Sequence, residues 1–310
     1  MQVAIVGSGM AGMTAARALH ETGVSVTVFE KARGFGGRMN TRRSAQGLFD
    51  MGAQYFTARD PLFMTAVRRW CDEGVAVEWK GRIVESHGGP LLERGGEVRY
   101  RGEPGMSRIC RFLGADLTVR FERRVTRIER RRDAWFLDNE GRFDAVLVSA
   151  PASQSAQLLE PVAPALAQRA RTAAMVPCVA LAILFEAPLS VGFQGAILRQ
   201  GPLSWVWIDE DKAVLHAAPD WSQEHFDQPE TETTATLLHA LRALVGAGLP
   251  ETVRVAQHGW RFARTVEALG VPYLWDPDLR IGACGDWCLG ARIESAYLSG
   301  VEAADVVVTS

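Results

Sequence analysis

The sequence predicts an α/β fold in which a domain of parallel sheet and a β-meander carries an inserted domain of antiparallel sheet and helices. The first observation is the order of patterns in residues 3–30, where a hydrophobic strand, a glycine turn, a helix and a second strand follow one another. The second observation is a further hydrophobic strand at 279–284 followed by an amphipathic helix. Between these segments lie short strand patterns and glycine turns, which indicate a different domain.

The glycine turn after the first strand has the spacing of a dinucleotide-binding motif. Gly7 permits the tight turn, Gly9 lets the backbone approach a pyrophosphate, and Gly12 lets the helix pack closely. Glu30 ends the second strand 18 residues after Gly12, where it can accept hydrogen bonds from ribose hydroxyls and would repel a 2′-phosphate. The helix N-terminus favours the pyrophosphate. The expected contacts in the turn are Gly7, Gly9, Met10, Ala11 and Gly12. The alternative is an ordinary βαβ unit that binds no ligand.

Composition excludes several classes of protein. The chain has 310 residues, 47% of them hydrophobic and 23% charged, as expected for a globular protein of two domains. A net charge of −2 gives no general attraction to nucleic acid or to an anionic membrane. Five scattered cysteines favour a reducing compartment. The first strand begins at the second residue, and no apolar run is long enough to span a bilayer, so we expect a cytoplasmic protein.

A second glycine cluster, Gly34–Arg38, follows the ribose acid. This arrangement resembles the Rossmann-like FAD-binding domain of the flavin amine oxidase superfamily, in which the arginine lies along the pyrophosphate and ribityl chain. A guanidinium can hold phosphate through two donors. The resemblance implies FAD contacts at Lys31, Gly37, Arg38 and Met39. The alternative for Arg38 is a solvated surface side chain.

The run from Asp50 to Asp60 resembles renalase-type flavoproteins, especially the bacterial ones. The resemblance implies that Gln54 hydrogen-bonds the flavin edge, that Tyr55 walls the site, and that Arg59 meets a substrate phosphate. The alternative is that Tyr55 is a core aromatic and Arg59 a neighbour of a helix cap. The implied substrate contacts are Tyr55, Thr57, Ala58, Arg59 and, near the C-terminus, Arg292.

Residues 120–132 are rich in arginine. No aromatic stacking platform accompanies them, so we interpret them as exposed positions of an antiparallel β-meander rather than as a nucleic-acid site. The resemblance to FAD-binding domains places the backbone of Val125 in a strand beside the adenine.

The C-terminal strand leads into Gly285-Asp286, and a helix follows. In FAD proteins of the resembled class, this acid binds the ribityl hydroxyls, and the helix N-terminus stabilises negative charge on the flavin. The resemblance therefore implies contacts at Asp286, Ile293 and Glu294. The alternative is a structural helix with a capping acid. No histidine or cysteine stands in a linkage context, so we expect FAD to be bound non-covalently.

The expected domain boundaries follow from these segments. Residues 1–60, 101–155 and 252–310 form the discontinuous FAD-binding domain, and residues 61–100 and 156–251 form the substrate domain. Helices are expected near 62–70, 107–113 and 231–245, and strands at 179–185, 204–208 and 214–217.

The reaction that the resemblance implies is oxidation of 2- or 6-dihydro-NAD(P) isomers to NAD(P)⁺, with dioxygen reduced to hydrogen peroxide. Amine oxidases of the superfamily usually carry a lysine on the strand before a Phe-x-x-Pro turn, and residues 175–188 contain none. Loss of hydride from a dihydropyridine needs no general base, so no catalytic side chain and no metal site is expected. The alternatives are an oxidase or desaturase of a small amine, and a non-catalytic FAD- or nucleotide-binding protein. The oligomeric state stays open.

Overall fold

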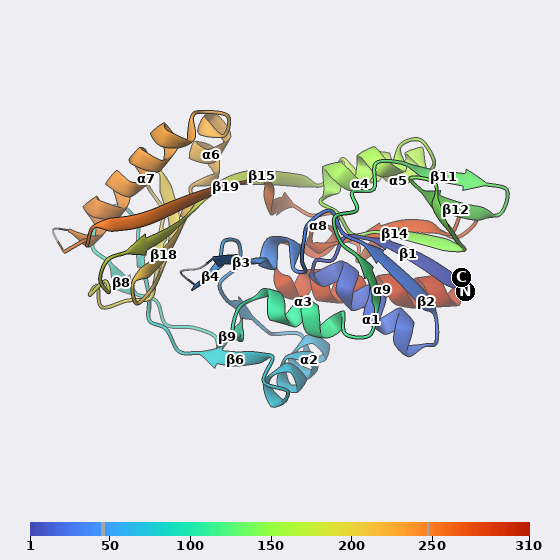
Figure 1. Ribbon diagram of the computed structural model, residues 1–310, viewed down its shortest axis with the longest axis horizontal. Coiled ribbons are helices and arrows are strands. Elements are labelled where there is room, and N and C mark those ends of the chain that lie inside the picture. Colours follow the sequence, from blue (N-terminus) through green and yellow to red (C-terminus); the bar gives the residue numbers. More distant parts are fainter. Residues whose placement is uncertain (45–46, 247) are drawn as a thin grey trace.

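The computed structural model describes residues 1–44, 47–246 and 248–310. Two lobes lie side by side, and the long strands β15 (Ala174–Phe185) and β19 (Thr252–Glu267) run from one lobe into the other (Figure 1). Both chain termini lie in the lobe that contains the first βαβ unit.

The nucleotide-binding lobe is built on a six-stranded sheet with the order β10-β2-β1-β14-β21-β20. All neighbours are parallel except β20, which pairs antiparallel with β21. The carboxyl ends of five strands therefore meet at one edge, where open α/β sheets bind ligands. The strands are β1 (Gln2–Val6), β2 (Ser25–Phe29), β10 (Thr118–Arg120), β14 (Ala145–Val148), β20 (Tyr273–Asp276) and β21 (Ile281–Cys284).

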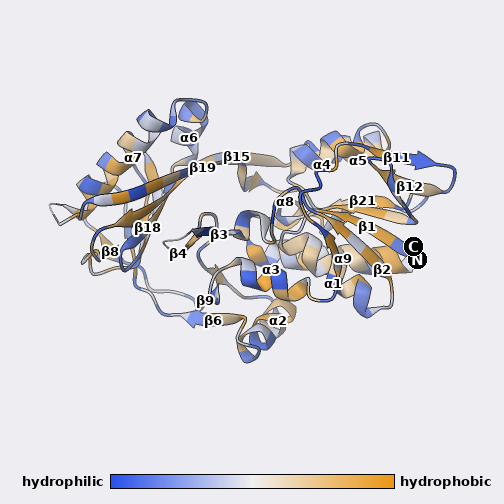
Figure 2. Ribbon diagram, in the orientation of Figure 1, coloured by the Kyte–Doolittle hydropathy of each residue, from blue (hydrophilic) through white to orange (hydrophobic). Residues whose placement is uncertain are grey.

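Alternate residues of these strands enter two separate hydrophobic cores, one on each face of the sheet. On β1, Val3 and Ile5 join the first core, and Ala4 and Val6 join the second. The first core contains helices α1 (Met10–Glu21) and α9 (Ile293–Thr309). Figure 2 shows the hydrophobic strands between these layers. Burial on both faces explains why the strands are continuous apolar runs, and the predicted α/β class is confirmed.

The second face of the sheet carries the predicted three-stranded meander, β11 (Ile128–Arg131), β12 (Ala134–Leu137) and β13 (Glu140–Phe143). Trp135 and Leu137 point into the second core. Arg131 of the meander pairs with Glu129. Arg120, expected in the meander, instead ends β10 of the parallel sheet and pairs with Glu140 of β13. β11 is hydrophilic in Figure 2, as expected for its exposed face.

The second lobe is a seven-stranded sheet with the order β19-β15-β18-β17-β16-β7-β8, antiparallel except between β16 and β7. One face forms a core with helix α7 (Glu230–Val245), and α6 (Pro219–His225) lies beside it. The other face packs against the hairpin β3–β4 of the first lobe. The remaining strands of this sheet are β7 (Ile83–Ser86), β8 (Leu92–Glu93), β16 (Gly195–Leu198), β17 (Leu203–Asp209) and β18 (Lys212–Ala217).

Shorter elements connect the lobes. The segment 37–113 contains η1 (Gly37–Met39), β3 (Thr41–Ser44), β4 (Gly47–Asp50), β5 (Phe56–Thr57), α2 (Pro61–Asp72), β6 (Ala76–Trp79), β9 (Arg99–Gly102) and α3 (Ser107–Leu113). The later short helices are α4 (Ala152–Leu159), α5 (Pro164–Ala170) and α8 (Asp286–Leu289). Within the described residues, no helix has the length and apolar character needed to cross a bilayer.

The structure moves three of the expected domain boundaries. Helices α4 and α5, expected in the substrate domain from residue 156, pack in the second core on the nucleotide-binding sheet. Helix α2, also expected in the substrate domain, packs in the first core through Phe63, Val67 and Trp70. Conversely, β19 begins in the second lobe paired with β15 and reaches the nucleotide-binding lobe only near its end, where Thr265 contacts Asp286, so the return does not come at residue 252.

Candidate FAD site

The glycine turn between β1 and α1 has the geometry that its sequence predicts. A Cβ atom on Gly12 would lie 2.1 Å from the carbonyl oxygen of Gly7, so the helix approaches the turn too closely for any side chain. A Cβ on Gly9 would meet its nearest protein atom only at 4.0 Å, the carbonyl oxygen of Gly36. The chain therefore leaves open space beside Gly9, at the start of α1.

The N–H groups at the start of α1 face this turn. Met13 N donates to Gly9 O as the first intrahelical bond, so the preceding N–H groups have no partner within the helix. Met10 and Ala11 are buried and can contribute only their backbone to a ligand. Free N–H groups and the helix dipole make this point an anion site.

Glu30 lies at the carboxyl end of β2 and is only 6% exposed. One carboxylate oxygen accepts hydrogen bonds from Ser8 N and Ser8 Oγ, both at 2.8 Å. The other accepts from Ala32 N at 2.7 Å. The acid is thus part of the turn as well as a candidate ribose ligand. Lys31, beside it, is exposed.

The position of Val125 differs from the expectation that this residue lies in a strand. It lies in an irregular segment before β11, not within a strand, because the meander begins only at Ile128. The segment still borders Glu30, since Arg123 N donates to Glu30 O at 2.9 Å. The backbone of Val125 therefore stays near the expected adenine end.

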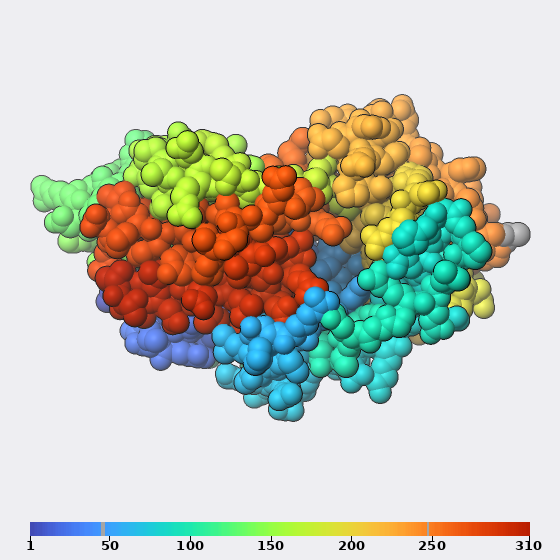
Figure 3. Space-filling view, turned by 180° about the vertical axis from the view of Figure 1, so that it is seen from behind, coloured from blue at the N-terminus to red at the C-terminus, as the bar shows by residue number. Residues whose placement is uncertain are grey.

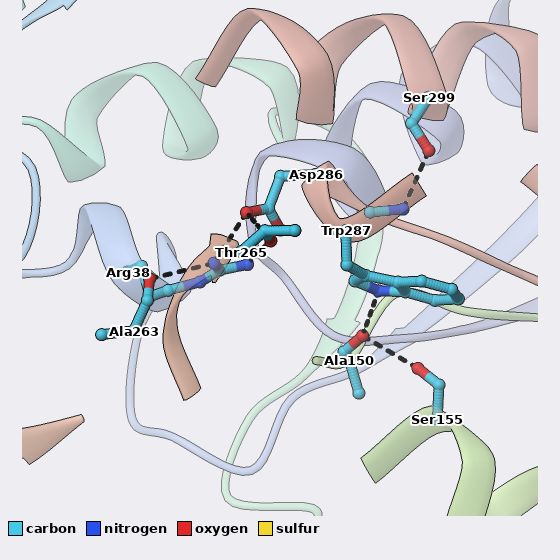
Figure 4. A network of polar contacts seen from close by, with 9 residues as sticks. Arg38, Ala150, Ser155, Ala263, Thr265, Asp286, Trp287 and Ser299 are labelled. Carbon is cyan, nitrogen blue, oxygen red and sulfur yellow. Dashed lines mark hydrogen bonds and ion pairs between the residues drawn. The ribbon is translucent and has the colours of Figure 1, made fainter. Parts of the chain in front are cut away.

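The second glycine loop lies against the first. A Cβ on Gly37 would be 3.5 Å from Gly9 Cα, and Gly36 N donates to Ser8 O. Met39 is buried, whereas Arg38 extends to the C-terminal segment. Its guanidinium makes two hydrogen bonds to Asp286, one of them 2.9 Å from Nη1 to Oδ2 (Figure 4).

Asp286 is held from several sides (Figure 4). Thr265 Oγ1 donates to its Oδ2 at 3.0 Å, and Arg38 Nη1 also donates to Ala263 O. Next to it, Gly285 N donates to Ser299 Oγ at 2.8 Å, and Trp287 Nε1 donates to Ala150 O at 3.0 Å. The structure thus joins the two residues predicted to hold the pyrophosphate and the ribityl chain, and Thr265 is a member that sequence reasoning missed.

Gln54 is engaged entirely by the protein in this structure. Its amide nitrogen donates to Asp50 O at 2.6 Å and to Gly52 O at 2.8 Å. Its amide oxygen accepts from Trp205 Nε1 of β17 at 2.9 Å. Only 4% of the residue is exposed. These bonds fasten the 50–55 loop to the second lobe.

His216 of β18 supports the same loop. Its Nε2 lies 2.9 Å from Met51 O, and because a carbonyl only accepts, Nε2 carries the proton. Burial lowers the pKa of His216, against the opposing effect of that bond. The imidazole is therefore neutral at physiological pH. No motif in the sequence signalled this residue.

Tyr55 belongs to an aromatic cluster that we define as Tyr55, Trp79, Trp205 and Trp207. Its ring stacks on Trp79 with centroids 5.4 Å apart and lies 5.6 Å from Trp205. Trp79 contacts Trp207 at 4.5 Å. Burial raises the pKa of the Tyr55 hydroxyl. Tyr55 is only partly buried, so the cluster forms a wall at the junction of the lobes.

Glu294 joins the predicted substrate residues. Its Oε1 accepts hydrogen bonds from Arg59 N at 2.6 Å and Asp60 N at 2.8 Å, and Arg292 Nη1 lies 3.4 Å from its Oε2. The acid is 7% exposed. Arg59 and Arg292 are thus brought together at the start of α9. Thr57 and Ala58 are partly buried beside them, and Ile293 packs on the first core.

The open space at Gly9 and the N–H groups at the start of α1 are suited to a pyrophosphate. Glu30 and the Arg38–Asp286 pair are the further polar groups available to FAD. In the space-filling view from behind, the surface is hollowed between the lobes, and atoms of an N-terminal segment are visible at the bottom (Figure 3).

Comparison with known proteins agrees with this geometry. The profile of an NAD(P)-binding Rossmann-like domain matches residues 5–73, and that of flavin containing amine oxidoreductases matches residues 84–308. The 4,4'-diapophytoene desaturase (4,4'-diaponeurosporene-forming) of Staphylococcus aureus (strain Newman) is 42% identical over 52 residues, which are 17% of this chain. That match spans 10% of the desaturase.

Two solved structures share the fold over nearly their whole length. A putative protoporphyrinogen oxidase from Exiguobacterium sp. 255-15 has a TM-score of 0.79 at 14% identity, covering 100% of this chain and 99% of that chain. Cyclohexylamine oxidase from Brevibacterium oxydans IH-35A has a TM-score of 0.77 at 14% identity, covering 99% and 98%. Since the second profile matches well over half of the chain, this protein belongs to the flavin-containing amine oxidoreductase family and is an FAD-dependent oxidoreductase.

Proposed function

We propose that this protein is a renalase-like oxidase, which converts 2- or 6-dihydro-NAD(P) isomers and dioxygen into NAD(P)⁺ and hydrogen peroxide. The observation that carries the proposal is that residues 175–188 lack the lysine that amine oxidases of the superfamily usually carry there. The chain has three lysines, Lys31, Lys80 and Lys212. None stands on β15. Lys212 lies on β18 opposite Leu184, and a Cβ on Gly47 would lie 3.1 Å from its Nζ, so its side chain lies beside the start of β4.

Bound FAD supplies the hydride acceptor and the route of two electrons to dioxygen. In the overall balance, one dihydropyridine, one dioxygen and one proton give NAD(P)⁺ and hydrogen peroxide. The dihydropyridine becomes aromatic when it loses hydride, so the protein needs to orient the ring and to hold the rest of the substrate. Tyr55 and its aromatic cluster can pack against the ring, and Arg59 and Arg292 can bind its phosphates.

We also propose a set of non-covalent FAD contacts. The start of α1 and Arg38 hold the pyrophosphate, Glu30 holds the ribose, and Asp286 holds the ribityl chain. The start of α9 lies beside the ring. The five scattered cysteines favour a reducing compartment, so we place the protein in the cytoplasm.

An amine oxidase or desaturase is the second candidate, and the aromatic cluster favours it. Trp79, Trp205 and Tyr55 present several ring faces at one wall, and aromatic faces attract cations such as a protonated amine. The lack of a lysine on β15 argues against this candidate.

Anaerobic rapid mixing distinguishes the candidates. The FAD-loaded protein is mixed with 2- and 6-dihydro-NAD(P), with ordinary NADH and with a panel of amines, and flavin absorbance is followed. Fast bleaching by the isomers, with little by NADH or amines, is expected. In air, NAD(P)⁺ and hydrogen peroxide should form in equal amounts. Bleaching by an amine alone would replace this proposal with the second candidate. Protein that binds FAD but is bleached by none of these compounds would favour a non-catalytic nucleotide-binding role.

A further inference from the structure

Three arginines surround one exposed glutamate beside the aromatic cluster. Arg59 Nε donates to Glu97 Oε1, and Glu97 lies on the loop between β8 and β9. Arg99, at the start of β9, lies with its guanidinium 6.0 Å from the centre of the Tyr55 ring. Arg292 lies nearby, because it pairs with Glu294, which also accepts a hydrogen bond from Arg59 N. Hydrogen bonding to Arg59, together with the charges of Arg59, Arg292 and Arg99, lowers the pKa of Glu97.

The two acids of this neighbourhood differ in how they are held. Glu294 is buried, and its Oε1 is occupied by two backbone N–H groups, so it forms part of the frame. The Glu97 side chain is 44% exposed, and its partner Arg59 is 53% exposed. An exposed ion pair of this kind contributes little to stability, because water and salt screen both charges. Glu97 can therefore leave Arg59 at small cost, whereas Glu294 cannot leave its place.

We propose that Arg59, Arg99 and Arg292 form the phosphate-binding site of the substrate, and that Glu97 is a displaceable counter-ion that occupies Arg59 until a phosphate replaces it. The inference rests on the proposed function and specifies its substrate class: a flat ring that carries an anionic phosphate tail. Arg99 is the residue that connects both parts, because it contacts the Tyr55 ring and also acts on Glu97.

We expect a phosphate to bind these arginines more tightly than the Glu97 carboxylate does. A phosphate offers several acceptor oxygens and more charge than a carboxylate, and guanidinium groups bind it through paired donors. The three arginines carry more charge than the two glutamates, Glu97 and Glu294, that they meet. The remaining positive charge attracts anions and is screened by salt.

The test compares Glu97→Gln with Glu160→Gln, both in FAD-loaded protein. Glu160 forms an ion pair with Arg171, and the two side chains are 47% and 50% exposed. This matched pair lies directly after α4 and α5, outside the proposed site. Binding of inorganic pyrophosphate is measured by calorimetry, which needs no turnover. Glu97→Gln should tighten binding about two- to fivefold, and Glu160→Gln should leave it unchanged. Arg99→Gln should weaken binding about tenfold or more.

Kinetics provide the second measurement. Glu97→Gln should lower KM for 6-dihydro-NAD(P) but not for neutral 1-methyl-1,6-dihydronicotinamide, which has the ring without phosphate. Equal pyrophosphate affinity in Glu97→Gln, Arg99→Gln and the parent protein would overturn the inference. If pyrophosphate binds as expected and no dihydropyridine bleaches the flavin, the phosphate site stands and the proposed reaction fails. If dihydropyridines bleach the flavin but pyrophosphate affinity is the same in Glu97→Gln, Arg99→Gln and the parent protein, the proposed reaction is supported and the phosphate site is refuted.

Discussion

Asp50 should make the protein less stable as the pH rises, which is opposite to the usual behaviour of a buried, bonded aspartate. It ends β4 and begins the loop that carries Gln54 and Tyr55. Burial raises its pKa from 3.8 to about 6, although hydrogen bonds from Thr41 and Met106 and the charge of Arg101 oppose that rise. The folded protein thus binds this proton more tightly than the unfolded chain does.

The direction and the size of the pH effect on stability follow from the difference between the Asp50 pKa in the folded protein and in the unfolded chain. Stability from protonated Asp50 is fully present below about pH 3.8, falls as the pH rises, and is lost above about pH 6. A pKa difference of about two units corresponds to about 3 kcal/mol. Asp50→Asn resembles the protonated acid. Thr41 Oγ1 and Met106 N both donate to Oδ1, at 2.6 and 3.0 Å, and an asparagine oxygen can accept both.

The assay is urea unfolding of the FAD-loaded parent and Asp50→Asn between pH 4.5 and 8. Taking the difference between the two proteins removes the common contribution of FAD binding. At pH 8 the variant should be more stable by about 2–3 kcal/mol, and the gap should narrow toward pH 4.5. Asp209→Asn, at an exposed end of β17, is the control and should show no such trend. A gap that is constant with pH, or a variant less stable at pH 8, would refute the reasoning.

Two further predictions concern the nucleotide turn. Gly12→Ala, whose methyl would lie 2.1 Å from Gly7 O, should lower the melting temperature and abolish FAD retention, whereas Gly9→Ala, with nothing nearer than 4.0 Å, should keep the fold and weaken FAD at least about tenfold; equal melting temperatures for the two would contradict the packing argument. Glu30→Gln should weaken FAD by about 1.5–3 kcal/mol, measured by flavin fluorescence, while Glu30→Ala should also destabilise the apoprotein because it leaves Ser8 N unpaired; unchanged FAD affinity in both would remove the ribose role.

The regular elements were predictable where local pattern and tertiary contacts agree. Helix α3 occupies 107–113, as the pattern predicted, and β17 and β18 differ from prediction only at their ends. β15 starts at Ala174, earlier than the predicted 179–185, because its early residues pair with β19. β19 itself carries Arg254, His258 and Arg264 and lies at the sheet edge, so it lacks the alternation that marks a half-buried strand.

The domain boundaries were less predictable, because an amphipathic pattern shows that a helix has a buried face without showing which sheet covers it. Ala156 and Ala167 give α4 and α5 such faces, and both pack on the nucleotide-binding sheet. Phe63 and Trp70 of α2 likewise reach the first core, where Tyr297 of α9 meets both rings. Which sheet each helix packs on is set by contacts between segments that are distant in the sequence.

At the candidate site, too, the sequence predicted individual residues but not the groups that those residues contact. Sequence resemblance predicted that Gln54 and Glu294 contact the cofactor, but a polar side chain can turn toward a ligand or toward the protein. Here the Gln54 amide spans the loop carbonyls and Trp205, and the Glu294 carboxylate spans Arg59 N and Arg292. Each therefore joins segments from distant parts of the chain. The second lobe sets the position of the 50–55 loop, and α9 sets the position of Arg59. We infer that the second-lobe sheet, through Trp205 and His216, orients the 50–55 loop as well as covering it.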